Sequence, residues 1–204
     1  MIRNVVFDMG GVLLDYQPIK ACRHFAPDEA SARAICAALF DAPEWKCLDH
    51  GTMTEDEALA VAQSRLPQGL HAAAALVMAH WDDYAFEPTP GMAELIAKLK
   101  RGGRRVYLLS NAGLRLRSYQ WRLPSVSLFD GLLVSAEERM VKPDAAIYRR
   151  LCERFGLAPE ECFFIDDLIA NVEGARNVGF SATVFDGDVA KLRATLREAG
   201  ALPE

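Results

Sequence analysis

The residues of this chain with the clearest chemical potential are polar side chains that follow apolar runs. Asp8 comes directly after the largely apolar run 2–7 and is followed by glycines at 10 and 11. A carboxylate at the point where a buried strand gives way to a glycine turn lies at the carboxyl edge of a sheet, where open α/β folds bind their ligands. A poorly hydrated carboxylate in that position is suited to attack an electrophile. Asp8 is therefore the candidate nucleophile.

Three further polar clusters follow later in the chain, each after another apolar run. They are Ser110 with Asn111, Lys142 with Pro143, and Asp166 with Asp167. Taken alone, most of these residues have ordinary explanations: a serine-asparagine pair is typical of turns, and a single lysine is usually a solvated surface side chain. The adjacent acids are less easily dismissed, because two neighbouring carboxylates repel each other unless a cation is present. The order of the four clusters predicts one shared site.

The elements that must position this site alternate regularly from residue 103 onward. We expect strands at 105–109, 131–134, 162–165 and 181–184, and helices at 114–121, 144–155, 170–178 and 189–199. The strands are continuous apolar runs and do not alternate with polar residues, which is typical of a parallel sheet buried on both faces. The pattern predicts a doubly wound α/β core.

A different pattern occupies the chain between residues 17 and 87. Strand signals are replaced there by Ala-rich helical stretches at 28–40, 55–66 and 71–81, and Thr54 followed by three acids indicates a helix N-cap. A proline-glycine break at 88–91 then precedes a helix at 92–100 that leads back into the core. We therefore expect a core made of residues 1–16 and 88–204, with residues 17–87 forming an inserted α-helical cap.

Composition narrows the class of partner. The chain of 204 residues has a formal net charge of −5 with acids and bases interspersed, so nothing indicates nucleic acid as a partner. No apolar stretch approaches the roughly 20 residues of a membrane span, and no signal-peptide pattern is visible, which favours a cytoplasmic protein without a membrane partner. The five cysteines are scattered without metal spacing, as expected of reduced thiols. Oligomeric state is left open.

The four clusters together resemble the motifs of the haloacid dehalogenase (HAD) superfamily. The matching segments, in order, are 7–13, 109–111, 141–143 and 164–167 with 171–175, and they extend over nearly the whole chain. The segment 51–58 also resembles the cap of a subgroup that contains sugar-1-phosphate phosphatases and the phosphatase half of epoxide hydrolases. This resemblance implies a HAD-like Rossmannoid core with a helical cap inserted just after the first strand.

The chemistry that the resemblance implies is phosphate transfer to Asp8, giving an aspartyl phosphate. A carboxylate and a phosphate repel each other, so the reaction needs neutralisation of the phosphoryl oxygens by Mg²⁺ and Lys142. The implied metal ligands are Asp8, the backbone carbonyl of Gly10, and Asp167, all of them the hard oxygens that Mg²⁺ prefers. Ser110 and its neighbouring amides are expected to donate to the phosphoryl oxygens at a helix N-terminus.

Several other polar residues lie near these motifs. Asp166 is expected to contact a metal ligand, or to reach the metal through a bridging water, without binding the metal directly. Asn111 either holds the loop or contacts the substrate. Asn171 either fixes the acidic loop with its amide or is an ordinary helix-start residue. Four aromatic residues could line the substrate cleft or fill the core: Trp45, Trp81, Trp121 and Tyr84.

Gly10 is a departure from the family pattern. Most phosphatases of this superfamily carry a second aspartate two residues after the nucleophile, and its carboxyl protonates the leaving oxygen and then activates the hydrolytic water. Its loss removes general acid-base help worth about 10²–10⁴ in rate unless water or a cap residue replaces it. Members of the sugar-phosphatase subgroup also carry glycine there, so the enzyme is expected to be slow or sensitive to the leaving group.

The sequence thus favours a Mg²⁺-dependent phosphatase of small phosphorylated metabolites, with sugar phosphates as the first expectation. Two alternatives stay open. A 2-haloacid dehalogenase also lacks the second aspartate, but it needs no Mg²⁺, which would leave Asp166 and Asp167 as an unneeded buried charge. A catalytically weakened HAD-like binding or regulatory domain would also explain Gly10, although it would not explain why Asp8, Lys142 and Asp167 are all present.

Overall fold

The core of the protein is one twisted parallel sheet. The computed structural model describes residues 1–202. Five strands form the sheet, in the spatial order β5-β4-β1-β6-β7. Their bounds are Asn4–Phe7 (β1), Arg105–Ser110 (β4), Gly131–Val134 (β5), Cys162–Asp166 (β6) and Ser181–Val184 (β7). All neighbouring pairs are parallel, so the predicted doubly wound parallel sheet is confirmed.

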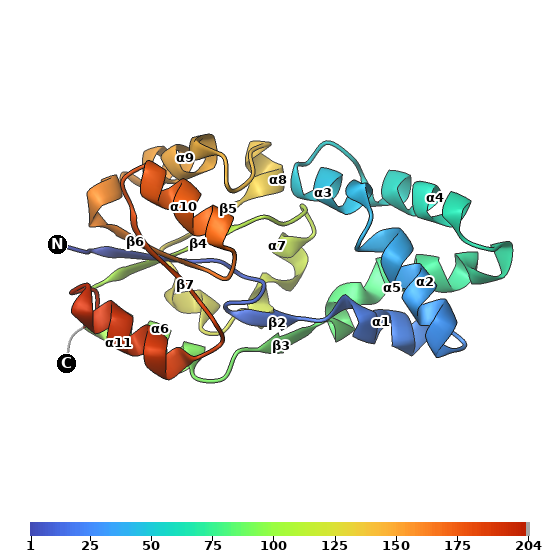
Figure 1. The fold of residues 1–204 in the computed structure, drawn as a ribbon, viewed down its shortest axis with the longest axis horizontal. Helices are drawn as coiled ribbons and strands as arrows, with labels where there is room; N and C mark the ends of the chain where they lie inside the picture. Colours follow the sequence, from blue (N-terminus) through green and yellow to red (C-terminus); the bar gives the residue numbers. More distant parts are fainter. Residues whose placement is uncertain (203–204) are drawn as a thin grey trace.

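Helices cover both faces of the sheet, as Figure 1 shows. One face packs against α6 (Met92–Arg101) and α11 (Val189–Glu198), and the other against α9 (Ala145–Phe155) and α10 (Ile169–Asn177). Successive strand residues point to opposite faces, so Val5 and Val6 belong to two separate hydrophobic clusters. Burial on both sides explains why the strands read as unbroken apolar runs.

One predicted core helix is shorter than expected. The helix expected at 114–121 is reduced to α7, Leu116–Tyr119, followed by a short 3₁₀ turn. Residues 111–115 form a loop that tertiary contacts hold: the Ala112 N–H donates to Ser135 Oγ at 2.9 Å, and Arg115 Nε donates to Glu55 Oε1 at 2.7 Å. A local pattern does not encode these distant partners. The short helix α8, Ser135–Glu138, was also not expected.

The segment between the first two core strands forms five helices. They are α1 (Pro18–Phe25), α2 (Glu29–Leu39), α3 (Pro43–Asp49), α4 (Glu55–Arg65) and α5 (His71–Tyr84). The sequence pattern missed α1 and α3, although each begins with a proline at its start, where the ring fits without loss of a hydrogen bond. At α4 the expected cap is confirmed, because Thr54 and Glu57 form a reciprocal capping box.

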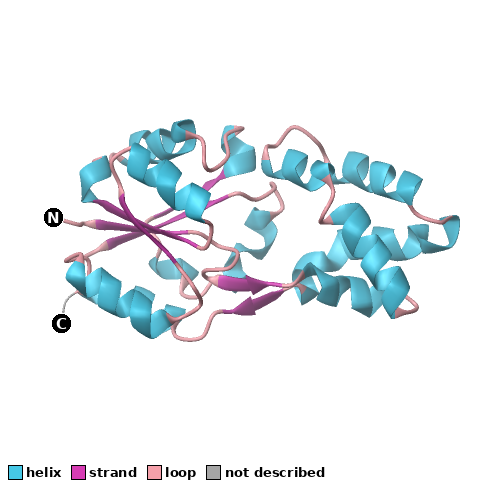
Figure 2. Cartoon of the chain, viewed as in Figure 1, coloured by secondary structure: helices cyan, strands magenta, loops and turns pink. Residues whose placement is uncertain are grey.

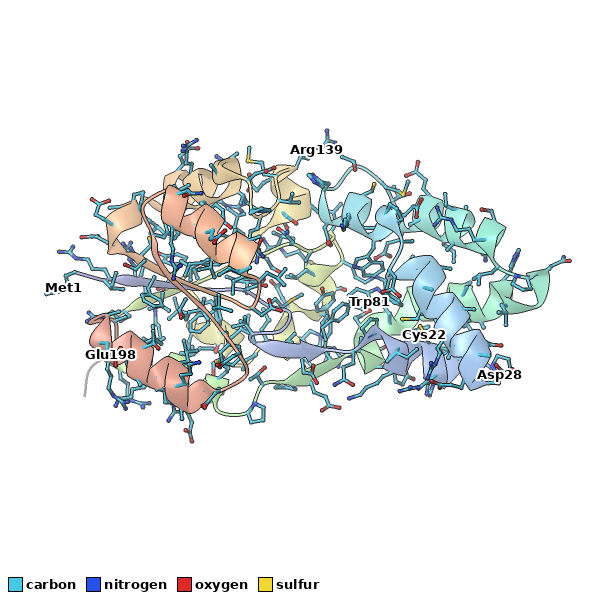
Figure 3. The ribbon with its side chains drawn as sticks, viewed as in Figure 1. Met1, Cys22, Asp28, Trp81, Arg139 and Glu198 are labelled. Atoms are coloured by element: carbon cyan, nitrogen blue, oxygen red, sulfur yellow. The ribbon has the colours of Figure 1, made fainter. Side chains whose placement is uncertain are left out.

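A two-stranded antiparallel ribbon joins the helical segment to the core. It pairs β2 (Leu14–Tyr16) with β3 (Phe86–Pro88) and lies between the sheet and the five helices (Figure 2). The proposed cap boundaries, after residue 16 and before residue 88, fall on this ribbon. Trp81 of α5 lies where the helical segment meets it (Figure 3). Among residues 1–202, none of the helices has the length and apolar character that crossing a bilayer requires.

Candidate active site

Lys142 lies between two acids at the centre of the site. Asp8 directly follows β1 and Asp166 ends β6, and these two strands are parallel neighbours, so their carboxyl ends meet. Lys142 Nζ lies 2.7 Å from Asp8 Oδ1 and 2.7 Å from Asp166 Oδ2. Lysine at 4% exposure would ordinarily lose its charge. Burial does lower the pKa of Lys142, but the two carboxylates outweigh it and raise that pKa above its usual value.

The same burial acts on Asp8. Desolvation raises the pKa of Asp8 to about 7; the positive charge of Lys142 opposes this rise, while the charge of Asp166 adds to it. A carboxyl with a pKa near 7 changes its protonation state easily when its surroundings change. One more cation beside Asp8 would favour the ionised form that attacks phosphorus.

Asp166 holds its neighbours in place. It is fully buried, and its Oδ1 accepts hydrogen bonds from the Leu168 N–H at 2.9 Å and from Asn171 Nδ2 at 2.9 Å. Its Oδ2 accepts from Lys142 Nζ at 2.7 Å. Both oxygens are thus occupied by protein donors, so Asp166 positions Lys142, and the buried amide of Asn171 fixes the acidic loop.

Asp167 is different, because it is partly exposed and lines the pocket described below. One carboxylate oxygen each of Asp8, Asp166 and Asp167 lies within 4.8 Å of the others. A Cβ added at Gly11 would lie 2.4 Å from Asp167 Oδ2, and Gly11 has φ +72°, so this position requires glycine. Because Gly11 has no side chain, it does not crowd the Asp167 carboxylate. A cluster of hard carboxylate oxygens of this kind fits a divalent cation such as Mg²⁺.

Asn111 ties the end of β4 to the loop before α9. Its Nδ2 donates to the Lys142 carbonyl at 3.0 Å, and its Oδ1 accepts from the Lys142 N–H at 2.8 Å. The residue therefore holds the loop, and it also lines the pocket. Ser110 is buried at the end of β4. The helix N-terminus expected beside Ser110 is wrong, because α7 begins only at Leu116 and comprises 4 residues.

A pocket of about 1070 Å³ lies between the core and the helical segment. Asp8, Lys142 and Asp167 lie in its wall on the core side. Much of the remaining wall is aromatic, with neighbouring ring centroids 5.1 to 6.0 Å apart; the rings belong to Tyr16, Trp45, Trp81, Phe86 and Tyr119. Two of the four aromatic residues considered from the sequence, Trp45 and Trp81, thus line the pocket. Trp121 is 66% exposed, and Tyr84 stacks on His24.

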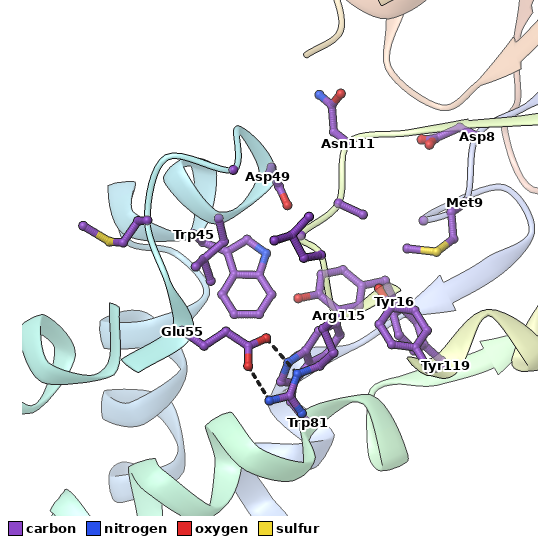
Figure 4. Close-up of a pocket in the computed structure, with 18 of the residues that line it drawn as sticks. Asp8, Met9, Tyr16, Trp45, Asp49, Glu55, Trp81, Asn111, Arg115 and Tyr119 are labelled. Carbon is purple, nitrogen blue, oxygen red and sulfur yellow. Dashed lines mark hydrogen bonds and ion pairs between the residues drawn. The ribbon is translucent and has the colours of Figure 1, made fainter. Parts of the chain in front are cut away.

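Two pocket residues carry chemistry that the sequence pattern did not single out. Asp49, at the end of α3, lines the pocket opposite the core acids (Figure 4). Arg115 binds Glu55 of α4 and the Ala79 carbonyl of α5, at 2.7 Å in each case, and so links α7 to two helices of the inserted segment. Neither residue follows an apolar run or belongs to a motif. Their placement depends on tertiary packing alone.

Together, the sheet, the acid-lysine cluster at its edge and the helices that cover the pocket define a hydrolase of the α/β class. A family model for haloacid dehalogenase-like hydrolases matches residues 2–179, and the chain belongs to that family. The resemblance drawn from the motifs is thereby confirmed.

Similar proteins include both phosphatases and dehalogenases. A sesquiterpene phosphatase of Aspergillus oryzae is 28% identical over 87% of this chain and 86% of its own length. A HAD family enzyme of Bacteroides thetaiotaomicron, in complex with magnesium and inorganic phosphate, superposes with a TM-score of 0.71 at 22% identity, covering 94% of this chain and 99% of its own. The L-2-haloacid dehalogenase of Xanthobacter autotrophicus gives 0.68 at 21% identity, covering 100% and 85%. The fold alone therefore does not separate the two activities.

Proposed function

We propose that this hydrolase is a Mg²⁺-dependent phosphatase of small phosphorylated metabolites. The observation that carries the proposal is the meeting of Asp8, Lys142 and Asp167 at one sheet edge inside the pocket. A dehalogenase has no use for a partly exposed acid beside a buried acid pair, whereas a metal-assisted phosphatase does. The relative named as a phosphatase and the structural neighbour with magnesium and phosphate support the same choice.

In this proposal Asp8, the Gly10 carbonyl and Asp167 would hold the metal. When bound, Mg²⁺ would neutralise the phosphoryl oxygens and lower the cost of attack by an anion. Asp8 forms a bond to phosphorus, and the bond from phosphorus to the leaving oxygen breaks with its electron pair. Lys142 stabilises the charge of the transferred group, while Asp166 and Asn111 keep the lysine in place.

The substrate is proposed from the shape and chemistry of the pocket. Sugar phosphates, the first expectation from the sequence, stay a prediction, because aromatic walls can bind the apolar face of a sugar ring. The same walls suit a purely apolar body, and a relative named as a sesquiterpene phosphatase supports testing prenyl phosphates as well. Trp81 Nε1 and Tyr16 Oη are buried without a partner among residues 1–202, so they are available to a polar group of the substrate. The cytoplasmic location expected from the sequence stays a prediction.

Phosphate release from a panel of substrates tests the proposal. The panel contains sugar phosphates, prenyl phosphates and para-nitrophenyl phosphate, each assayed with Mg²⁺ and with excess EDTA, and 2-haloacids are assayed for halide release. We expect phosphate release that requires Mg²⁺. Full activity in EDTA would contradict the metal role, halide release without phosphate release would identify a dehalogenase, and no turnover of either class would favour a binding domain.

A further inference from the structure

The pocket contains a carboxyl that could replace the one missing at Gly10. We propose that Asp49, on the helical segment that covers the core, is the general acid and general base of this hydrolase. The inference rests on the proposed phosphatase function, since it names the residue that donates the proton to the leaving oxygen of the phosphate ester. It makes the covering segment part of the catalytic machinery, in addition to any role in substrate selection.

Asp49 and Asp8 enter the pocket from different sides (Figure 4). The Asp49 carboxylate enters it from the end of α3, whereas Asp8 enters the same pocket from the core. A leaving group attached to a phosphoryl group at Asp8 must extend away from the sheet, toward the side where Asp49 lies. Among residues 1–202, no N–H or O–H group donates to the Asp49 carboxylate, so the group is available to a substrate.

The core fixes the position of Asp49. Ser135 Oγ donates to the Asp49 carbonyl at 2.6 Å, and the same hydroxyl oxygen accepts from the Ala112 N–H at 2.9 Å. Gly51 has φ +65°, and a Cβ there would lie 2.3 Å from the Ala136 carbonyl, so the turn after α3 packs directly on α8. A catalytic group must be held close to its productive geometry, and these contacts tie the helix end to the core.

The electrostatic surroundings suit proton transfer. Burial raises the pKa of Asp49 to about 7; the charge of Asp8 adds to the rise, and Lys142 opposes it. General acid-base catalysis is most efficient when the pKa lies near the working pH, because both protonation states are then accessible. A phosphate dianion entering the pocket would favour the protonated form further.

The other titratable groups on this side of the pocket are less suited to proton transfer. Burial raises the pKa values of the Tyr16 and Tyr119 phenols above their usual range, so both stay neutral near pH 7. Glu55, on the neighbouring helix α4, is held in an ion pair with Arg115. The other two acids of α4 that line the pocket are exposed, so Asp49 is the partly buried carboxyl on this side that no protein donor among residues 1–202 holds.

The two proton transfers balance. As Asp8 attacks phosphorus and the bond to the leaving oxygen breaks, the Asp49 carboxyl gives its proton to that oxygen, releasing a neutral alcohol. The Asp49 carboxylate then takes a proton from a water molecule whose oxygen attacks the aspartyl phosphate. The bond from phosphorus to Asp8 breaks, inorganic phosphate leaves, and both acids return to their starting states.

The test compares leaving groups in the wild-type enzyme and in Asp49→Asn. For a primary alkyl phosphate, whose leaving oxygen needs a proton, kcat/KM should fall by about 10²–10⁴. For para-nitrophenyl phosphate, whose leaving group departs as an anion, kcat/KM should change by less than about tenfold, which also shows that the variant is folded. Asp41→Asn, which removes an exposed acid from the same segment, should leave both values unchanged.

A pH profile gives an independent readout. Wild-type kcat/KM for the alkyl phosphate should decline above a pH near 7 as the acid deprotonates, and this decline should be absent in Asp49→Asn. Equal losses on both substrates, or an unchanged dependence on leaving-group pKa, would overturn the assignment of Asp49 while the phosphatase function stands. A wild-type enzyme that releases no phosphate from any ester would instead overturn the proposed function itself.

Discussion

The core and the inserted helical segment both contribute to one pocket, but they hold their polar side chains in opposite ways. In the core, Lys142 bridges Asp8 and Asp166, and Asn171 completes the hydrogen bonds of Asp166. In the helical segment, the Asp49 carboxylate and Trp81 Nε1 have no protein partner among residues 1–202. Polar groups whose hydrogen bonds are all made within the protein keep a fixed geometry, whereas polar groups without a protein partner are available to a ligand. The difference indicates that the core holds the reacting phosphoryl group and that the segment above it meets the rest of the substrate.

The largest effect should come from the core side. Asp8→Asn keeps the shape of the side chain but removes the nucleophile, so kcat/KM for para-nitrophenyl phosphate should fall by at least about 10³. The fold should persist, because Lys142 keeps its ion pair with Asp166. Thermal unfolding serves as the control. Retention of more than a tenth of the activity by a folded variant would mean that another residue attacks.

The two adjacent acids should separate metal binding from stability. Asp167→Ala should abolish Mg²⁺ binding with little change in stability, since Asp167 is partly exposed. Asp166→Ala should weaken Mg²⁺ binding less but lower the free energy of unfolding by about 3 kcal/mol, because it removes one of the two carboxylates beside buried Lys142 and leaves Asn171 Nδ2 without its acceptor. Calorimetric titration and urea unfolding measure the two quantities. Equal loss of Mg²⁺ binding would show that both acids are ligands, and the reverse order would place the metal on Asp166.

The strands and site residues of the core could be predicted closely, because each is marked by a pattern within a short stretch of the sequence. Each strand is an apolar run that ends at a polar residue, and the strands observed differ from those expected by at most a residue or two at their ends. Parallel strands bring their carboxyl ends to one edge, so polar residues far apart in sequence were expected to meet there. Asp8, Lys142 and Asp166 do meet.

The covering segment could not be predicted to the same depth. Asp49 is an ordinary acid at a helix end, and it is held over the core by the contact of its carbonyl with Ser135 Oγ and by the packing of Gly51 on Ala136. The helix after β4 was expected to begin at residue 114, but residues 111–115 form a loop in which Arg115 is held by Glu55 of α4. Contacts between distant segments decided both outcomes, and no periodicity or spacing in the chain records them.

Substitutions at two neighbouring glycines, Gly10 and Gly11, test whether Mg²⁺ binding in the core needs the space beside Asp167. Gly11→Ala forces a methyl group against Asp167 at a positive φ, so Mg²⁺ binding and activity should fall by about 10- to 100-fold, the equivalent of 1–3 kcal/mol of strain. Gly10→Ala keeps its backbone carbonyl and meets nothing closer than Tyr16 Cβ at 3.9 Å, so its effect should stay within a few-fold. Kinetic titration with Mg²⁺ measures both variants. Similar losses would mean that the clearance beside Asp167 has no role in metal binding.

The smallest effect should appear in the stability of Asp49→Asn as a function of pH, measured without Mg²⁺. The pKa of Asp49 is raised in the folded protein from 3.8 to about 7, so the folded state favours the protonated form. Below about pH 3 the carboxyl is protonated in both the folded and the unfolded chain, and the variant should gain nothing. As the pH rises from about 4 to 7, the carboxyl ionises in the unfolded chain but stays protonated in the folded one, so the wild-type protein loses stability, and the loss is complete above pH 7. The neutral amide does not share this penalty.

The variant should therefore be more stable than the wild type by about 1 kcal/mol at pH 8, the modest size reflecting partial exposure and the opposing charge of Lys142. In a chain of this length that corresponds to a rise of roughly 2–4 °C in Tm. Asp8 titrates in both proteins, so the difference between them isolates Asp49. A difference that is the same at pH 5 and pH 8, or a variant that is less stable at pH 8, would show that Asp49 is well solvated. The contrast between core acids that are held by protein donors and a poorly solvated Asp49 without a donor would then no longer hold.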